Sequence, residues 1–166
     1  MKRLSMLLAV CAFFVCSMAY AQTTKEFVHK AATAGMKEVK AGELAQRKGV
    51  SPRVKEFGAR MVHDHTQANQ ELMAIVKRKG MAAELPAPGS IMGDPMLEKA
   101  SGKEFDRMYV TMMVSDHKEA VALFENAARN ERDPEIKMFA KNTLPKLRQH
   151  LESIKSIAAE MHINSR

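Results

Sequence analysis

Histidines and carboxylates inside apolar helical patterns are the side chains of this 166-residue sequence most capable of chemistry. A motif of the form Met-Val-x-Asp-His-x-x-Ala occurs twice, at residues 61–68 and 113–120, and contributes His65 and His117. His150 lies in another apolar pattern further along the chain. Imidazoles and carboxylates bind copper and divalent metals, and they also form hydrogen-bonded networks in protein cores. The sequence therefore indicates either a metal site or a buried polar network.

Helical periodicity places five such residues in or beside the apolar face of their segments, near the middle of each. They are Glu38, His65, Asp116, His117 and His150. Packed helices of similar length would bring them to one level, where a buried charge must be paired or bind a metal. We therefore predict one divalent metal or copper ion, with these five residues as candidate ligands. Asp64 points about 100° away from His65, so we expect it to support a ligand by hydrogen bonding.

The alternative interpretation is a buried Asp–His–Glu network that fixes the register of the helices without any metal. The protein would then be a structural or interaction module of the cell envelope. An enzyme is the less favoured class, because the Glu-x-x-His pairs of ferritin-like di-iron proteins are absent. Val62, Val114 and Leu147 stand three residues before the central histidines instead. We also find no Gly-x-Ser-x-Gly motif and no nucleophile beside a base.

Four amphipathic helices are expected to position these residues, at about 24–48, 52–79, 102–130 and 134–162. Capping residues mark their expected starts: Thr23, Ser51, Ser101 and Asp133. Glycines follow the first two helices, as is usual at helix ends. Pro145 falls inside the fourth helix and is expected to kink it.

The lengths of the connections predict how the helices are arranged. Short turns near residues 49–51 and 131–133 indicate two antiparallel hairpins, and a match of residues 51–58 to 133–140 suggests a duplicated hairpin. Residues 81–100, rich in proline and glycine, join the hairpins. Twenty extended residues reach roughly 66 Å, whereas a 25-residue helix is only about 38 Å long. The predicted fold is therefore all-α, a ferritin-like four-helix bundle with one long crossover.

The first 21 residues have the pattern of a secretory signal peptide that is cleaved after about Ala21. Lys2 and Arg3 precede an apolar run, and small residues surround the expected cleavage point. Cleavage would remove both cysteines of the chain, and with them any disulfide or thiolate metal site. We therefore expect residues 22–166 to form one domain in the periplasm or outside the cell, without a transmembrane span.

The net charge of the chain gives less information about its partners than the motifs give about its site. Without Lys2 and Arg3, the 24 lysines and arginines exceed the 19 acidic residues by five. The basic residues are spread along every segment with almost no aromatic residues between them, so we expect no nucleic-acid partner. Contact with an anionic envelope surface remains open, and the sequence does not set the oligomeric state.

Four stretches carry a resemblance to a known family. They are Gly35-Met36-x-Glu38-Val39, Met61-Val62-x-Asp64-His65-x-x-Ala68-Asn69, Phe105-Asp106 through His117 to Glu125, and Thr143-Leu144-Pro145-x-Leu147-x-x-His150-Leu151. Across about residues 24–160 the chain resembles the exported bacterial family called domain of unknown function 4142. That resemblance implies a ferritin-like fold and a place in the periplasm or envelope.

The helix expected at 102–130 also resembles the related domain of unknown function 305, some of whose members bind copper. Asp116 stands where the motif of that family has a second histidine. The sequence thus predicts a periplasmic protein that binds a metal ion at mid-bundle. Its expected role is metal handling or tolerance of envelope stress.

Overall fold

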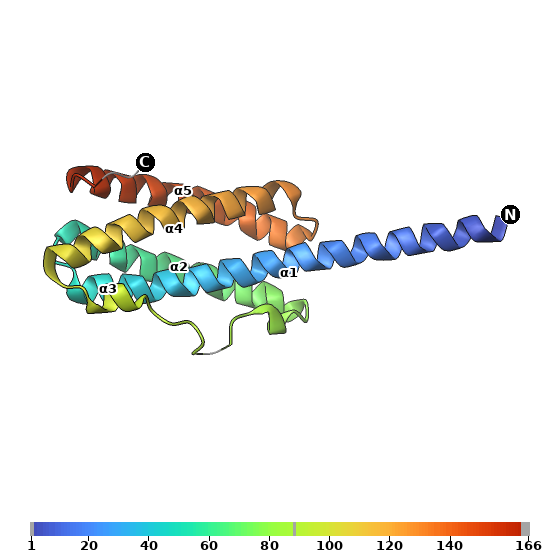
Figure 1. The fold of residues 1–166 in the computed structure, drawn as a ribbon, viewed down its shortest axis with the longest axis horizontal. Coiled ribbons are helices and arrows are strands. Elements are labelled where there is room, and N and C mark those ends of the chain that lie inside the picture. The colour runs from blue at the N-terminus through green and yellow to red at the C-terminus, as the bar shows by residue number, and fades with distance from the viewer. Residues whose placement is uncertain (1, 88, 164–166) are drawn as a thin grey trace.

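A computed structural model describes the backbone of residues 2–87 and 89–163, and side chains from residue 24 onward within those ranges. This part of the chain holds four long helices and no strand (Figure 1). The long helices are α1 (Lys2–Lys48), α2 (Pro52–Arg78), α4 (Gly102–Asn130) and α5 (Pro134–Glu160). The predicted all-α class is therefore confirmed.

The four long helices pack as two hairpins. α1 lies along α2 and α4 lies along α5, while α1 also contacts α4 and α2 contacts α5. α2 and α4 run in the same direction, which is possible only because the segment between them returns along the whole bundle (Figure 1). This is the predicted ferritin-like arrangement of two hairpins joined by a long crossover.

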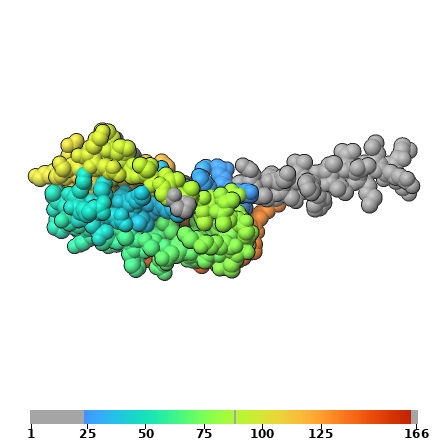
Figure 2. Space-filling view, turned by 90° about the horizontal axis from the view of Figure 1, so that it is seen from below, coloured from blue at the N-terminus to red at the C-terminus, as the bar shows by residue number. Residues whose placement is uncertain are grey.

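The crossover is tied to both ends of the bundle along α1. Near its start, the Glu84 carboxylate lies 2.8 Å from Lys25 Nζ, and the Glu84 carbonyl oxygen accepts a hydrogen bond from His29 Nδ1 at 3.2 Å. Near its end, Lys48 Nζ donates to the carbonyl oxygens of Glu98 and Ala100. Figure 2 shows the crossover running beside α1 from one end of the bundle to the other.

Two short helices in the crossover were not predicted: a 3₁₀ helix, η1 (Ala82–Glu84), and α3 (Pro95–Lys99). Asp94 caps α3 by accepting hydrogen bonds from the next two amides that can donate, at 2.8 and 2.9 Å. Asp133 caps α5 in the same way. The Asp-Pro pair that correctly marked the fourth helix therefore marks α3 as well.

The expected helix ends are correct within one or two residues, with one exception. α1 continues as a helix through Thr23, so this threonine does not cap it. The reason is that the apolar segment before Thr23 is rich in helix-forming residues and extends the same helix. Ser51 and Ser101 occupy N-cap positions without a side-chain capping hydrogen bond. α5 continues past Pro145 to Glu160.

The predicted signal peptide, residues 1–21, falls outside the residues whose side chains are described, so its cleavage stays a prediction. In the part of the chain that the structure describes, no helix combines the length and the apolar character that crossing a membrane requires.

The core consists of two apolar clusters separated by a polar layer. One cluster joins Phe27, Leu72, Phe124 and Phe139 with their neighbours, and the other joins Phe57, Tyr109, Met113 and Ile154 with theirs. On each long helix, one buried polar residue lies between the stretches that enter the two clusters. These residues are Glu38, His65, His117 and His150, which are exposed by 2%, 5%, 0% and 1%.

Candidate metal centre

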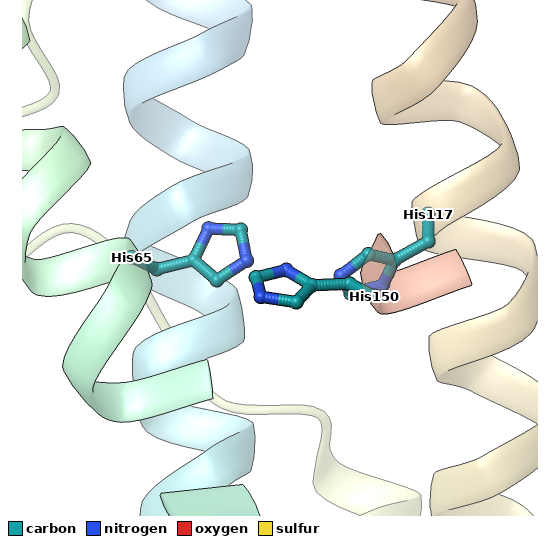
Figure 3. A group of neighbouring side chains, drawn as sticks. All are labelled: His65, His117 and His150. Atoms are coloured by element: carbon teal, nitrogen blue, oxygen red, sulfur yellow. The ribbon is translucent and has the colours of Figure 1, made fainter. Parts of the chain in front are cut away.

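Three imidazole rings converge in the polar layer. His65 from α2, His117 from α4 and His150 from α5 point toward one another between the helices (Figure 3). One ring nitrogen of each lies within 4.8 Å of one ring nitrogen of each of the others. Nitrogens bound to one zinc or copper ion stand roughly 3.3–3.6 Å apart, as follows from metal–nitrogen bonds of about 2.0–2.1 Å. The three nitrogens therefore lie within about 1.5 Å of the spacing that one shared ion requires.

The rings of His65 and His117 are each held at Nδ1. His65 Nδ1 lies 2.9 Å from Glu38 Oε2, and His117 Nδ1 donates to the Met113 carbonyl oxygen at 2.9 Å. The second oxygen of Glu38 lies 3.6 Å from His117 Nδ1. Glu38 therefore faces the outer side of two rings and fixes the orientation of His65.

The third ring is held at its other nitrogen. His150 Nε2 donates to Asp64 Oδ2 at 2.8 Å. The second oxygen of Asp64 lies 2.9 Å from Nδ1 of the exposed His63 and 3.6 Å from Lys146 Nζ. Asp64 thus supports a histidine as expected from the sequence, but the histidine belongs to α5 and not to its own helix.

The inner nitrogen of each ring has no hydrogen-bond partner. These atoms are His65 Nε2, His117 Nε2 and His150 Nδ1, and all are buried. Because the outer nitrogens face acceptors, they carry the protons, and the inner nitrogens keep free lone pairs. A proton held on the outer nitrogen by a carboxylate or carbonyl is the usual arrangement in histidines that bind metals.

Burial and charge set the protonation of these groups. Burial alone would raise the pKa of Glu38, but the neighbouring His65, His117 and His150 outweigh it and hold the pKa below its usual range. Burial lowers the pKa of His117, against the charge of Glu38, and lowers the pKa of His150 to about 4 despite its bond to Asp64. At neutral pH His117 and His150 are therefore uncharged and lie beside carboxylate anions, an environment that favours a cation.

Glycines bring α1 close enough for Glu38 to reach His65. A Cβ atom added to Gly42 would lie 2.6 Å from the Gly58 carbonyl oxygen, and one added to Gly58 would lie 2.8 Å from that of Gly42. Both distances are shorter than packed atoms allow, so the backbones of α1 and α2 touch here. Glu38 lies one helical turn before Gly42, so the close packing of α1 on α2 brings its carboxylate within reach of His65.

The structure does not bring Asp116, the fifth predicted ligand, to the three rings. Its half-buried side chain lines grooves beside α1, because a residue directly before His117 leaves the helix about 100° away from it. The sequence also gave no signal for the Met113 carbonyl, which any residue four positions before His117 could supply.

Two further buried carboxylates were not predicted as site residues, although Asp106 belongs to one of the stretches that carry the family resemblance. Asp106 accepts hydrogen bonds from the amides of Val50 at 3.1 Å and Ser51 at 2.8 Å, in the α1–α2 turn. Glu131 Oε1 accepts from the Thr24 hydroxyl at 2.7 Å and from two amides of the α4–α5 turn. Both serve the backbone at the ends of the bundle.

Comparison with known proteins identifies the family of the chain. The family profile named domain of unknown function (DUF4142) matches residues 15–157, as the sequence resemblance predicted. No curated protein gives a significant match.

Several solved structures share the fold. CopM in the Cu(I)-bound form has a TM-score of 0.70 and 18% identity, covering 83% of this chain and 96% of CopM. The Cu(II)-bound form of CopM has a TM-score of 0.68 and 17% identity over 83% and 97% of the two chains. A protein of domain of unknown function 305 from Streptomyces coelicolor has a TM-score of 0.71 and 10% identity over 85% and 94%. At such identities the likeness shows the fold alone.

Proposed function

The chain belongs to the DUF4142 family, and from its mid-bundle geometry we propose that the protein binds a single metal ion through His65, His117 and His150. Glu38 and Asp64 orient two of these rings and balance the charge of the ion. The Met113 carbonyl orients the third. Asp116 is left out of the ligand set that we propose, because its side chain lies beside α1 and away from the rings.

The observation that carries this proposal is the set of three unpartnered nitrogens, one on each ring. A network without metal would leave all three buried acceptors unsatisfied, at a cost of roughly 1–3 kcal/mol each. Metal coordination satisfies all three at once. The outer nitrogens already have acceptors, so binding at neutral pH needs no rearrangement of their hydrogen bonds.

The donor set favours copper or zinc. Imidazole suits both metals, and the described side chains include no cysteine. CopM, which shares the fold, has been solved in Cu(I)-bound, Cu(II)-bound and Ag-bound forms. This likeness supports copper as the first ion to test.

Burial of the site suggests metal handling more than catalysis. His65, His117 and His150 are each exposed by 5% or less, so a bound ion would be surrounded by protein with little room for a substrate. The three rings would hold the ion, while the two apolar clusters on either side exclude water from it. Together with the predicted signal peptide, this supports a periplasmic protein that sequesters or carries metal, or protects the envelope from it.

The test is elemental analysis of the protein purified without a histidine tag, followed by melting curves in EDTA, copper and zinc. One equivalent of metal, with a melting temperature that rises on loading and falls in EDTA, is expected. No bound metal and no shift with any ion would contradict the proposal. The same residues would then be a structural network in an interaction module, the alternative that the sequence left open.

A further inference from the structure

A groove between α1 and α4 leads toward the histidines from one side of the bundle. It has a volume of about 460 Å³, and its most buried lining residue is Glu38. A second, larger hollow beneath the crossover shares Thr33, Lys37 and Asp116 with it. The groove therefore connects open surface with the carboxylate that touches two of the three rings.

Glu38, which lines this groove, has one carboxylate oxygen without a hydrogen-bond partner. Its Oε2 is engaged by His65, whereas its Oε1 is buried without a hydrogen-bond partner and lies 3.6 Å from His117 Nδ1. A buried anionic oxygen without a partner is costly, so a cation that reaches it is expected to bind there. Thr33 adds a second unpartnered buried oxygen to the lining of the same groove.

Charged residues of both signs line the outer part of the groove. Asp116 and Glu119 of α4 face Lys30 and Lys37 of α1. With Glu38 included, three carboxylates and two lysines line the groove, and Lys30 is paired with Glu26 at 2.6 Å. The groove therefore has an excess of negative charge, which attracts cations.

The opposite side of the bundle is less suited to admit a cation. There Asp64 lies between the surface and His150, but both of its oxygens are engaged, one by His150 and the other by His63. Lys146 lies 3.6 Å from the same carboxylate and would repel an approaching cation. Of the two carboxylates beside the rings, only Glu38 keeps an oxygen without a partner.

We propose that the α1–α4 groove is the route by which the metal ion reaches the three histidines. Asp116 and Glu119 capture the cation at the surface, and it then passes Glu38 to reach the inner nitrogens of the three rings. Asp116 is thus a transient contact on the route and not a permanent ligand. This inference rests on the proposed metal site and adds the residues that control how fast the site fills.

The test is the rate of Cu²⁺ binding at low ionic strength, followed by tyrosine fluorescence, which bound Cu²⁺ quenches. The chain has no tryptophan and only two tyrosines, and Tyr20 lies in the predicted signal peptide, so Tyr109 in the core is the single reporter of the mature protein. Asp116→Asn is expected to slow binding about 3–10-fold and Lys37→Gln to accelerate it by a similar factor, as in electrostatic steering. The equilibrium dissociation constant should change less than about twofold in both variants, because neither residue contacts the bound ion.

Matched variants separate a local route from the overall charge of the protein. Glu71→Gln removes a negative charge from the exposed surface of α2, and Lys146→Gln removes a positive charge beside Asp64. Neither should change the rate as much as its counterpart in the groove. If Lys146→Gln accelerates binding and Lys37→Gln does not, the ion enters beside Asp64 and the proposed route is wrong.

A second variant blocks the groove by size instead of charge. Ala34 is half-buried in its lining, and Ala34→Phe should slow both Cu²⁺ binding and its removal by a chelator by the same factor. An unchanged rate in both directions would overturn the route. If Asp116→Asn weakens equilibrium binding as strongly as His65→Ala, Asp116 is a ligand and its transient role is wrong. Failure of the unaltered protein to bind any Cu²⁺ would instead overturn the metal site itself.

Discussion

The ends and the middle of this bundle both bury carboxylates, but they use them differently. At the ends, Asp106 and Glu131 accept hydrogen bonds from backbone amides of the two turns, so the polar groups satisfy one another locally. In the middle, Glu38 and Asp64 hold the outer sides of histidine rings, and the inner nitrogens of those rings have no protein partner.

This difference separates structural polar groups from those of a binding site. A buried group that serves only the fold is expected to have its hydrogen bonds complete, because each unmade bond costs stability. In the middle layer, three ring nitrogens that could accept hydrogen bonds lie close together without partners. The apolar clusters on either side could pack against each other without this polar layer. Apolar side chains in this layer would leave no unsatisfied acceptors, and replacements of this kind are often neutral or stabilising.

The largest effect is expected from removing a ring. His65→Ala or His150→Ala should abolish stoichiometric metal binding, a loss of affinity of more than about 100-fold, because two imidazoles hold an ion poorly. Helix content measured by circular dichroism should be retained. Isothermal titration with Cu²⁺ and Zn²⁺ provides the measurement, and His162→Asn, at the exposed end of α5, serves as the control that should bind normally.

Removing a carboxylate at the end of the bundle should give the opposite pattern. Asp106→Ala leaves the amides of Val50 and Ser51 without their buried acceptor and should lower the free energy of unfolding by about 2–4 kcal/mol. Urea unfolding of the metal-free protein measures this loss. Metal affinity should stay within about twofold. A large loss of affinity would show that the carboxylates at the ends of the bundle also contribute to the metal site.

The carboxylates of the middle layer should have an intermediate effect. Glu38→Gln and Asp64→Asn keep the size of the side chains but weaken the hydrogen bonds that orient His65 and His150. Metal affinity should fall about 10–100-fold, as is usual for such supporting groups. Competition titration against a chelator of known affinity measures it. Unchanged affinity in both variants would mean that the carboxylates do not help to bind the ion.

The smallest effect concerns the pH dependence of the metal-free protein. The unfolded His150 ring takes up a proton below its ordinary pKa near 6.5, whereas the buried ring does so only near 4. Stability contributed by the neutral ring should therefore be lost as the pH falls from about 6.5 to 4. The raised pKa of Asp116 acts in the opposite direction, so the useful quantity is the difference between the unaltered protein and His150→Gln.

For that difference, melting temperatures are compared between pH 4 and pH 7. The unaltered protein should lose more stability than His150→Gln on acidification. Equal losses would show that His150 does not have the depressed pKa that its burial implies.

The depth of the polar layer was predictable from the sequence, but its hydrogen bonds were not. Periodicity located Glu38, His65, His117 and His150 at the middle of their helices, since these residues interrupt clear apolar patterns. The pairing of Asp64 with His150 depends on how α2 and α5 are rotated about their axes, and an apolar pattern does not determine that rotation. The same uncertainty made Asp116, at the edge of its pattern, look equivalent to its neighbour His117.

The crossover shows a different reason for incomplete prediction. Its length and its proline and glycine content correctly predicted a segment that returns along the bundle. The short helix α3 was missed because five residues are too few for a periodic pattern, although its Asp94-Pro95 start is the same capping signal that located α5. Local capping chemistry was informative there, whereas hydrophobic periodicity was not.

X-ray absorption spectroscopy of the copper-loaded protein tests the central claim most directly, because it reports which atoms surround the ion. We predict a first shell of three imidazole nitrogens at about 2.0 Å, with the imidazole contribution reduced or lost in His65→Ala. A shell dominated by sulfur would place the ion at methionines, and copper that is not retained would leave nothing to measure. Either result would contradict a metal centre formed by His65, His117 and His150.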